Sequence, residues 1–300
     1  MSFLLPGTSL SDAAHRRPAG WGAWLLLTPL ALWLLLFVVV PTVMLVVISF
    51  CQRQPDAIGE IVYDFTLENY GRALDPLYLK ILGKSVLYAL VTTALCLVIG
   101  YPVAYFIARA GDRWRNILLL LVMIPFWTSF LVRTYAWISI LSSNGFLNAA
   151  LIGLGWIEEP IPIMYTPYAV VLGLVYNYLP FMILPIYGSV EKLDNALVEA
   201  AYDLGARPGH AFFRVILPLT RPGIVAGFFM VFVPAIAMFA ITTLMGGGSD
   251  PTIGEVIQKQ FLAARHAPFG AALGTLLLLL FFVALLLVRP RASRSEEAAA

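Results

Sequence analysis

Charged side chains are scarce in this chain of 300 residues. Asp, Glu, Lys and Arg make up 12% of the sequence, and 60% of it is hydrophobic. Ordinary soluble domains carry about 25% charged and about 45–50% apolar residues. The formal net charge of +2 is small and spread along the chain, which argues against nucleic acid as a partner. This composition favours a membrane protein over a soluble one.

Cysteines, metal-ligand patterns and catalytic motifs are few or missing. The two cysteines, Cys51 and Cys96, predict no disulfide, because Cys96 lies inside an apolar run, and we interpret both as small apolar side chains. The three histidines have no metal-ligand spacing, and neither HExxH nor GxSxG occurs. We therefore expect no catalytic residue, no metal and no cofactor. An integral membrane enzyme is disfavoured for the same reason.

Long apolar runs are the dominant feature of the sequence. Crossing a hydrocarbon core of about 30 Å takes about 20 apolar residues in a helix. The first run is too long for a cleavable signal peptide, so we interpret it as an uncleaved span. Prolines interrupt most of the runs, which a membrane bundle tolerates. Six spans are expected, at residues 24–50, 81–108, 117–140, 165–186, 224–244 and 267–288.

The Lys and Arg residues predict the orientation of these spans. With the N-terminus inside, the cytoplasmic segments hold 12 of the 19 Lys and Arg residues and the external segments hold five. The other two, Lys84 and Arg133, lie within apolar runs. This bias places both termini in the cytoplasm. The expected parts are a cytoplasmic tail (1–23), a first span with an external loop (24–80), a bundle core (81–290) containing a long cytoplasmic loop (189–221), and a C-terminal tail (291–300).

The long loop, residues 189–221, is predicted to be structured. Connections between bundle helices usually take about 2–8 residues, and this one is far longer. Asp194 is a good N-cap, Gly205 stands where a left-handed residue ends a helix, and Pro208 suits the first turn of a second helix. We therefore expect a helix over 195–204 and a second short helix that ends near Leu217 and Pro218.

The first of these helices carries an apolar stripe with small residues at its centre, formed by Leu197, Ala200, Ala201 and Leu204. A stripe of this kind at a surface docks into the groove of a partner. The alternative is that it packs against its own bundle. The sequence does not decide between the two.

The long loop resembles the EAA loop of ABC-importer permeases. That pattern is Glu-Ala-Ala, three residues, Gly, nine residues, Ile, any residue and Leu-Pro. This sequence matches it with Glu199, Ala200, Ala201, Gly205, Leu217 and Pro218, and departs from it only at Val215. In the family the loop forms coupling helices that insert into a cleft of a cytoplasmic ATPase. The resemblance implies that Glu199 and Gly205 fix its charge and turn, and that Ala200 and Ala201 permit close approach.

Further segments look like the spermidine/putrescine branch of this family, which also includes opine and organophosphonate importers. These segments are 65–70, 125–129, 133–137, 145–148, 257–261 and 268–270. The resemblance implies an all-α polytopic membrane helix bundle with the type I ABC-importer permease fold, in a bacterial inner membrane. It also implies a cytoplasmic ABC ATPase dimer, a second and different permease subunit, and a periplasmic or lipoprotein substrate-binding protein as partners.

ATP hydrolysis is expected in another subunit, because this chain has no nucleotide site of its own. Residues Gly83, Lys84 and Ser85 are similar to the end of a P-loop, but the position that needs glycine holds Tyr78. We interpret Lys84 as a lysine at a helix end, whose stem lies along apolar surface. The chain itself is therefore expected to be a non-catalytic membrane subunit.

Arg133 is the one charge deep enough within a span to need an explanation. It either reaches outward or pairs with an external acid, or it lines the transport pathway. The candidate pathway residues are Arg133, Tyr135, Trp137, Tyr176, Asn177 and Tyr178. Aromatic faces suit a polyamine, but the spans hold no Asp or Glu, so the charge of the substrate stays open. The rival interpretation is an ion-coupled secondary transporter, which would show inverted repeats or intramembrane acids.

Overall fold

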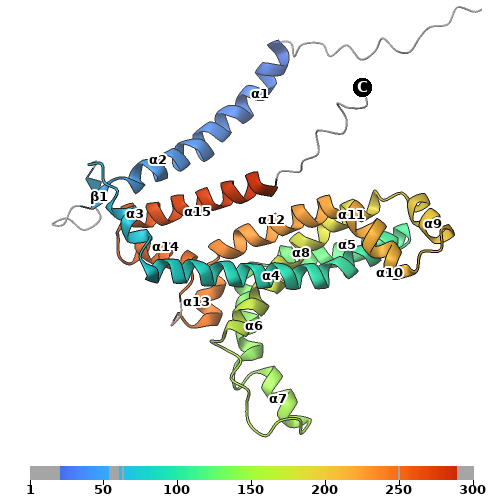
Figure 1. Ribbon diagram of the computed structural model, residues 1–300. Coiled ribbons are helices and arrows are strands. Elements are labelled where there is room, and N and C mark those ends of the chain that lie inside the picture. Colours follow the sequence, from blue (N-terminus) through green and yellow to red (C-terminus); the bar gives the residue numbers. More distant parts are fainter. Residues whose placement is uncertain (1–20, 54–60, 63, 249–250, 289–300) are drawn as a thin grey trace, which may run out of the picture.

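The computed structural model describes residues 21–53, 61, 62, 64–248 and 251–288 (Figure 1). Most of the predicted N-terminal tail (1–23), and all of the C-terminal one (291–300), lie outside the described residues. The N-terminal half contains α1 (Trp21–Leu34), η2 (Leu35–Val39), α2 (Val40–Ser49), β1 (Gln52–Arg53), β2 (Ile61–Val62), α3 (Glu68–Ala73), α4 (Pro76–Arg109), α5 (Asp112–Met123), η3 (Ile124–Trp127), α6 (Phe130–Leu141) and α7 (Phe146–Gly153). The C-terminal half contains α8 (Pro167–Glu191), α9 (Asn195–Asp203), α10 (Pro208–Ala211), η4 (Phe212–Ile216), α11 (Leu217–Leu219), α12 (Arg221–Ala237), α13 (Ala240–Gly246), α14 (Ile253–Leu262) and α15 (Ala267–Val288).

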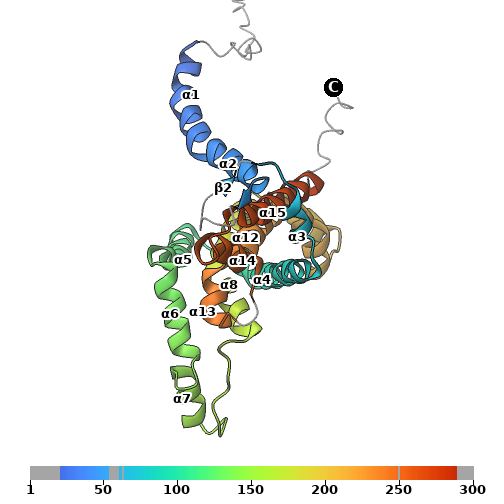
Figure 2. The same cartoon turned by 90° about the vertical axis from the view of Figure 1, so that its left-hand side faces the viewer.

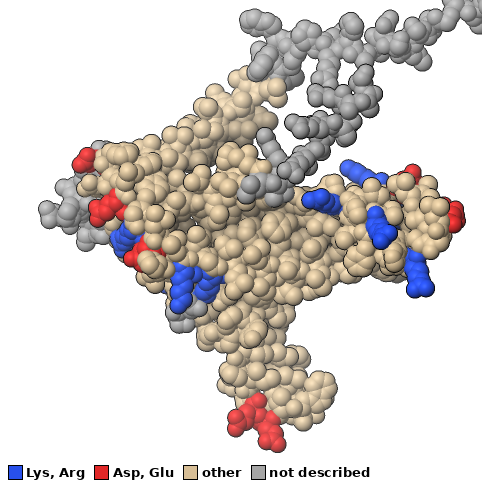
Figure 3. All heavy atoms as spheres, in the orientation of Figure 1, with Lys and Arg blue, Asp and Glu red and all other residues tan. Residues whose placement is uncertain are grey.

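The protein is an all-α bundle apart from one short hairpin, in which β1 pairs antiparallel with β2. Within the described residues, five helical segments are long and apolar enough to cross a membrane. The bent pair Pro208–Leu219 and Arg221–Ala237, which meets at 66°, gives a sixth. Charged side chains gather over α9–α11 at one end of the bundle and near α3 and the start of α4 at the other, with an uncharged surface between them (Figure 3). This is the charge distribution of a membrane-spanning bundle.

Two of the predicted spans are broken rather than continuous. The predicted helix over 117–140 changes at Pro125, which lacks a backbone N–H, into the short 3₁₀-helix η3. Thr128 is then extended, with ψ 147°, before α6 begins. The predicted helix over 224–244 stops at Ala237, because Met238 is extended with ψ 120°, and α13 follows. Both ranges thus contain a defined break, at Pro125–Thr128 and at Met238.

The core lies between α4, α8 and α12, which pack against one another along their lengths. Small residues permit this close packing. A Cβ atom at Gly223 of α12 would lie 2.5 Å from the carbonyl oxygen of Pro185 on α8, and one at Gly227 would lie 2.7 Å from Met182 Sδ. Cys96 of α4 is fully buried, and both cysteines are free, as predicted.

Two parts of the chain stand away from this core. The most apolar stretch of the span Leu27–Ser49 has no residue buried against the rest of the chain. Helices α6 and α7 project from the opposite side of the bundle (Figures 1 and 2). Exposed apolar side chains here include Val132, 64% exposed, and Phe146, 77% exposed. These surfaces are apolar enough to be covered by lipid or by another membrane protein.

A buried carboxylate lies in the segment that precedes α15. Glu255 is 1% exposed, and its Oε1 accepts a hydrogen bond from Thr243 Oγ1 at 2.8 Å. Its Oε2 accepts from the backbone N–H of Thr252, which completes a capping box at the start of α14. The Thr-x-x-Glu spacing of Thr252 and Glu255 is the local sequence signal for this cap.

Candidate functional site

The long loop has the local structure that its sequence predicts. Helix α9 begins after Asp194, whose Oδ1 accepts a hydrogen bond from the backbone N–H of Ala196 at 2.9 Å. It ends at Leu204, and Gly205 follows with φ +82° in the left-handed region. The predicted cap, helix and glycine turn are therefore confirmed.

The second half of the long loop is a continuous helical segment from α10 through η4 to α11. Pro208 stands in its first turn, as predicted. The segment ends at Thr220, two residues beyond Pro218. Thr220 is fully buried, and its hydroxyl lies 2.9 Å from the hydroxyl of Tyr101 on α4. Leu217 and Pro218 thus lie where the long loop joins the core.

The apolar stripe of α9 does not pack against its own bundle. Leu197 is 49% exposed and Leu204 is 89% exposed, and Ala200 is also exposed. Of the residues of α9 only Val198, on the other face, is buried. The structure thus favours the docking interpretation of the stripe.

A hollow of about 450 Å³ opens beside this stripe, between α9 and the helices that follow it. Its floor is apolar or small, with Ala201, Gly205 and Ala211 among its residues. Arg207, His210 and Arg214 also line it. The arrangement can accept a side chain or a short helix of a partner protein, with an acidic group near the arginines.

Arg133 lies among aromatic rings at the break in the α5–η3–α6 segment. Its guanidinium carbon is 5.9 Å from the ring centroids of both Phe126 and Tyr176. The Trp137 and Tyr176 rings meet edge to face at 5.5 Å, and those of Phe126 and Phe181 at 4.9 Å. We call these five side chains the Arg133 cluster.

The guanidinium of Arg133 is held by ring faces rather than by acids. Its Nε and Nη1 atoms are buried and have no hydrogen-bond partner, and no ion pair to Arg133 occurs among the described residues. Tyr176 is about 14 Å along α8 from Pro167, at 1.5 Å per residue. The cluster therefore lies within the apolar part of the bundle.

Only three of the six predicted pathway residues lie together in the structure. Arg133, Trp137 and Tyr176 lie together. Asn177 is 6% exposed and donates to the carbonyl oxygen of Gly173, and Tyr178 donates to that of Pro234 on α12. These two side chains pack in the core, whereas Tyr135 is 56% exposed on another face of α6. Phe126 and Phe181 belong to the cluster and were missed, although Phe126 lies in one of the segments that carry the family resemblance.

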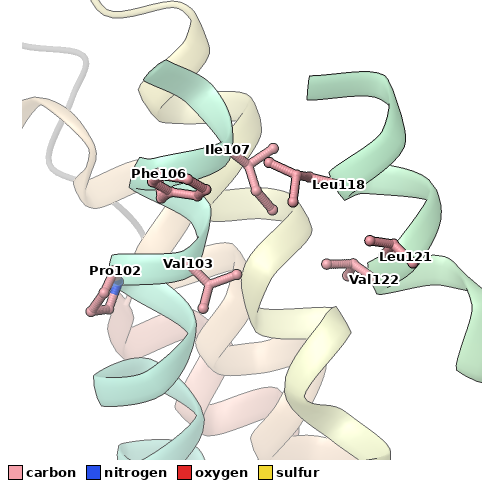
Figure 4. Close-up of a pocket in the computed structure, with 7 residues that line it drawn as sticks. All are labelled: Pro102, Val103, Phe106, Ile107, Leu118, Leu121 and Val122. Carbon is pink, nitrogen blue, oxygen red and sulfur yellow. The ribbon is translucent and has the colours of Figure 1, made fainter. Parts of the chain in front are cut away.

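Two further hollows lie along the apolar part of the bundle. One, of about 680 Å³, runs between α4 and α8 and is lined by Tyr88, Tyr168, Tyr176 and aliphatic side chains. The other, of about 430 Å³, separates α4 from α5 (Figure 4). The second is lined only by apolar residues, namely Pro102, Val103, Phe106, Ile107, Leu118, Leu121 and Val122. It offers no polar group to a polar solute, so we assign no solute site there.

Comparison with known proteins identifies the family. Residues 97–292 match the family model "Binding-protein-dependent transport system inner membrane component". The chain is 48% identical over 262 residues to the spermidine/putrescine transport system permease protein PotB of Salmonella typhimurium, covering 87% of this chain and 90% of that one. It is equally similar to the PotB protein of Escherichia coli K12, covering 94% of that protein. Among solved structures, a bacterial alginate ABC transporter in complex with an alginate-bound periplasmic protein matches with TM-score 0.64 at 17% identity, over 89% of this chain and 92% of that one.

A membrane-spanning bundle with an exposed two-helix loop is the architecture of a transport permease that works with a partner protein. The chain belongs to the family of binding-protein-dependent transport system inner membrane components. It is a multi-pass inner-membrane permease subunit, and the ion-coupled secondary transporter is not favoured. Among the described residues, no group of three or more His, Cys, Asp or Glu side chains is placed to hold a metal ion.

Proposed function

We propose that this permease imports a polyamine such as spermidine or putrescine, or a closely related small cation, driven by a separate cytoplasmic ATPase dimer. The similarity to two spermidine/putrescine permeases over 87% of the chain carries the choice of substrate. The Arg133 cluster does not add to this choice, because its ring faces are already occupied by the Arg133 guanidinium, whose charge repels a second cation. The exposed stripe of α9 supports the partnership with an ATPase.

The long loop is the proposed docking site for the ATPase. Glu199, Ala200 and Ala201 lie on the α9 helix that exposes Leu197 and Leu204, and Gly205 sets the turn that directs the following helix. Leu217 and Pro218 join the long loop to α12. ATP-driven closure of the ATPase dimer would move α9, and the spans would follow. Access to the pathway would then switch from the cytoplasmic to the external side.

The second permease and the external binding protein are the other proposed partners. The unburied span Leu27–Ser49 and the projecting α6 and α7 are surfaces that a second, different permease would cover. A binding protein would dock at the end of the bundle opposite α9. The similar alginate transporter was solved in complex with a periplasmic protein, which supports a binding protein as a partner. Substrate would then enter between the two permeases near Arg133, Trp137 and Tyr176.

Uptake of radiolabelled spermidine and putrescine tests this function. We expect uptake only when the chain is produced together with an ATPase, a second permease and a binding protein from the same importer. Uptake should persist when a protonophore collapses the ion gradients, and it should stop when the ATPase is inactivated. Uptake that needs the gradient but not the ATPase would contradict the proposal.

Fusion of an enzyme that is active only outside the cytoplasm tests the proposed orientation. The excess of Lys and Arg supports an orientation with both termini and the long loop inside. A fusion after Ser143, between α6 and α7, or after Gly247, beyond α13, should be active. A fusion after Arg113 or Gly209 should be silent. The reverse pattern would overturn the orientation.

A further inference from the structure

One ion pair ties the start of α5 to the end of α8. The Nη1 atom of Arg115 lies 3.2 Å from Oε1 of Glu191, which is the last residue of α8. Tyr187, one turn earlier on α8, donates its hydroxyl to the same Oε1 at 2.5 Å. The Nη2 atom of Arg115 lies 2.8 Å from Asp112, whose side chain is 91% exposed. Glu191, whose side chain is 41% exposed, is therefore held by two partners, and Asp112 is more exposed still.

Helix α5 is otherwise loosely attached to the bundle. It contains no buried residue, and the 430 Å³ hollow lies between it and α4 (Figure 4). In the described part of the chain, Arg115–Glu191 is the only ion pair that joins α5 to another helix. Leu118, Leu119 and Val122 of α5 are half-buried against the core, and the open hollow beside them gives α5 room to shift while this tie holds its first turn.

Beyond the Arg115–Glu191 pair, the α5–η3–α6 segment contacts α8 again at two pairs of aromatic rings. Phe126 of η3 packs edge-on against Phe181, about 15 Å along α8 from Glu191. Trp137 of α6 then meets Tyr176, about 8 Å farther on. The broken span is thus fastened to α8 at the Arg115–Glu191 pair and at the two ring contacts of the Arg133 cluster.

The end of α8 is also the base of the long loop. Only three residues, 192–194, separate Glu191 from α9. The side chain of Arg109, at the end of α4, donates a hydrogen bond to the side chain of Asn195, the first residue of α9. A displacement of α9 would therefore also move Glu191, because only about one helical turn of chain lies between them.

We propose that Arg115 is a positioning residue that transmits movement of the long loop to the broken span, an inference that rests on the proposed docking of an ATPase at α9. When α9 moves, Glu191 moves with it and draws Arg115 and α5 along. The hollow beside α4 gives α5 room, and the extended backbone at Thr128 allows α6 to change direction. The Arg133 cluster is repositioned as a result.

Labelling of a cysteine introduced by Ser129→Cys tests this transmission in the assembled importer. Ser129 is exposed at the break, and the two native cysteines are buried. A small maleimide should react at different rates without nucleotide and with ATP plus vanadate, which traps the closed ATPase. In an Arg115→Gln background we expect this difference to shrink roughly two- to fivefold, the scale of a partly exposed ion pair. ATPase copurification should be unchanged.

Charge exchange and a matched control complete the experiment. Arg115→Glu combined with Glu191→Arg, in an Asp112→Asn background that removes the like charge beside position 115, should restore most of the labelling difference that either single change reduces. Asp112→Asn, which removes the exposed partner of the same arginine, should behave like the unsubstituted chain. Equal labelling in Arg115→Gln and Asp112→Asn, or no restoration by charge exchange, would overturn the role of Arg115. The proposed docking of the ATPase would still stand in that case. If the ATPase does not copurify with the unsubstituted chain, the proposed docking fails and this inference fails with it.

Discussion

Gly205→Val should reduce ATP-driven uptake about five- to thirtyfold while the protein still reaches the membrane. Gly205 has φ +82°, and a β-branched residue in this region strains the turn by about 1–2 kcal/mol, which is about five- to thirtyfold in an equilibrium. A Cβ atom at Gly205 would meet nothing within 4 Å, so the backbone conformation alone carries the effect. The altered turn would direct the second half of the long loop away from its partner. Uptake, membrane abundance and ATPase copurification measure the outcome.

Two matched variants separate this turn from a general effect of bulk. Gly209 lies in the same long loop, also has open space around it and has an ordinary backbone conformation. Gly209→Val should therefore retain most uptake. Gly205→Asn should fall between the two, because asparagine tolerates the left-handed conformation. Normal uptake and normal ATPase copurification in Gly205→Val would show that the turn is not needed for docking.

The long loop could be predicted almost residue by residue because its signals are local. A cap such as Asp194 bonds to a backbone group two residues away, and the conformation at Gly205 depends on its own lack of a Cβ atom. Pro208 has a fixed φ that suits a helix start. Sequence reasoning could not decide whether the apolar stripe is covered, because covering depends on residues far away in the chain.

The broken spans could not be predicted because proline does not have one structural outcome in a membrane bundle. Pro102 and Pro180 lie inside uninterrupted helices, whereas the helix changes at Pro125. The outcome depends on whether neighbouring helices satisfy the backbone groups that a proline leaves unpaired, and the hydropathy of a segment does not report this. The same limit explains the break after Ala237, where no proline or glycine marks the extended Met238.

Helix geometry could have narrowed the predicted set of pathway residues. Tyr176, Asn177 and Tyr178 are consecutive, so on a helix they point in different directions, about 100° apart. Only Tyr176 meets Trp137, and the other two turn into the core. Arg133 and Trp137 are four residues apart and share a face, whereas Tyr135 lies on another. Spacing alone would have favoured Arg133, Trp137 and Tyr176.

Arg133→Ala should lower uptake by up to about thirtyfold, since a contact of up to about 2 kcal/mol to aromatic faces would be lost. The guanidinium lies over two rings at once, Phe126 of η3 and Tyr176 of α8, and so joins the pieces of the broken span. Arg133→Lys should give intermediate uptake, because a compact ammonium keeps the charge but not the planar contact. Leu131→Ala, which changes an exposed position of α6, is the matched control.

Membrane abundance must be measured beside uptake in each Arg133 variant, because the same arginine could serve only to hold its span in place. Uptake per molecule in the membrane decides between the two roles. If the Arg133 cluster lies on the pathway, uptake per molecule should fall in the order arginine, lysine, alanine, while ATPase copurification stays normal. Reduced abundance with normal uptake per molecule would assign Arg133 to anchoring. Normal abundance and normal uptake in both variants would remove Arg133 from the pathway.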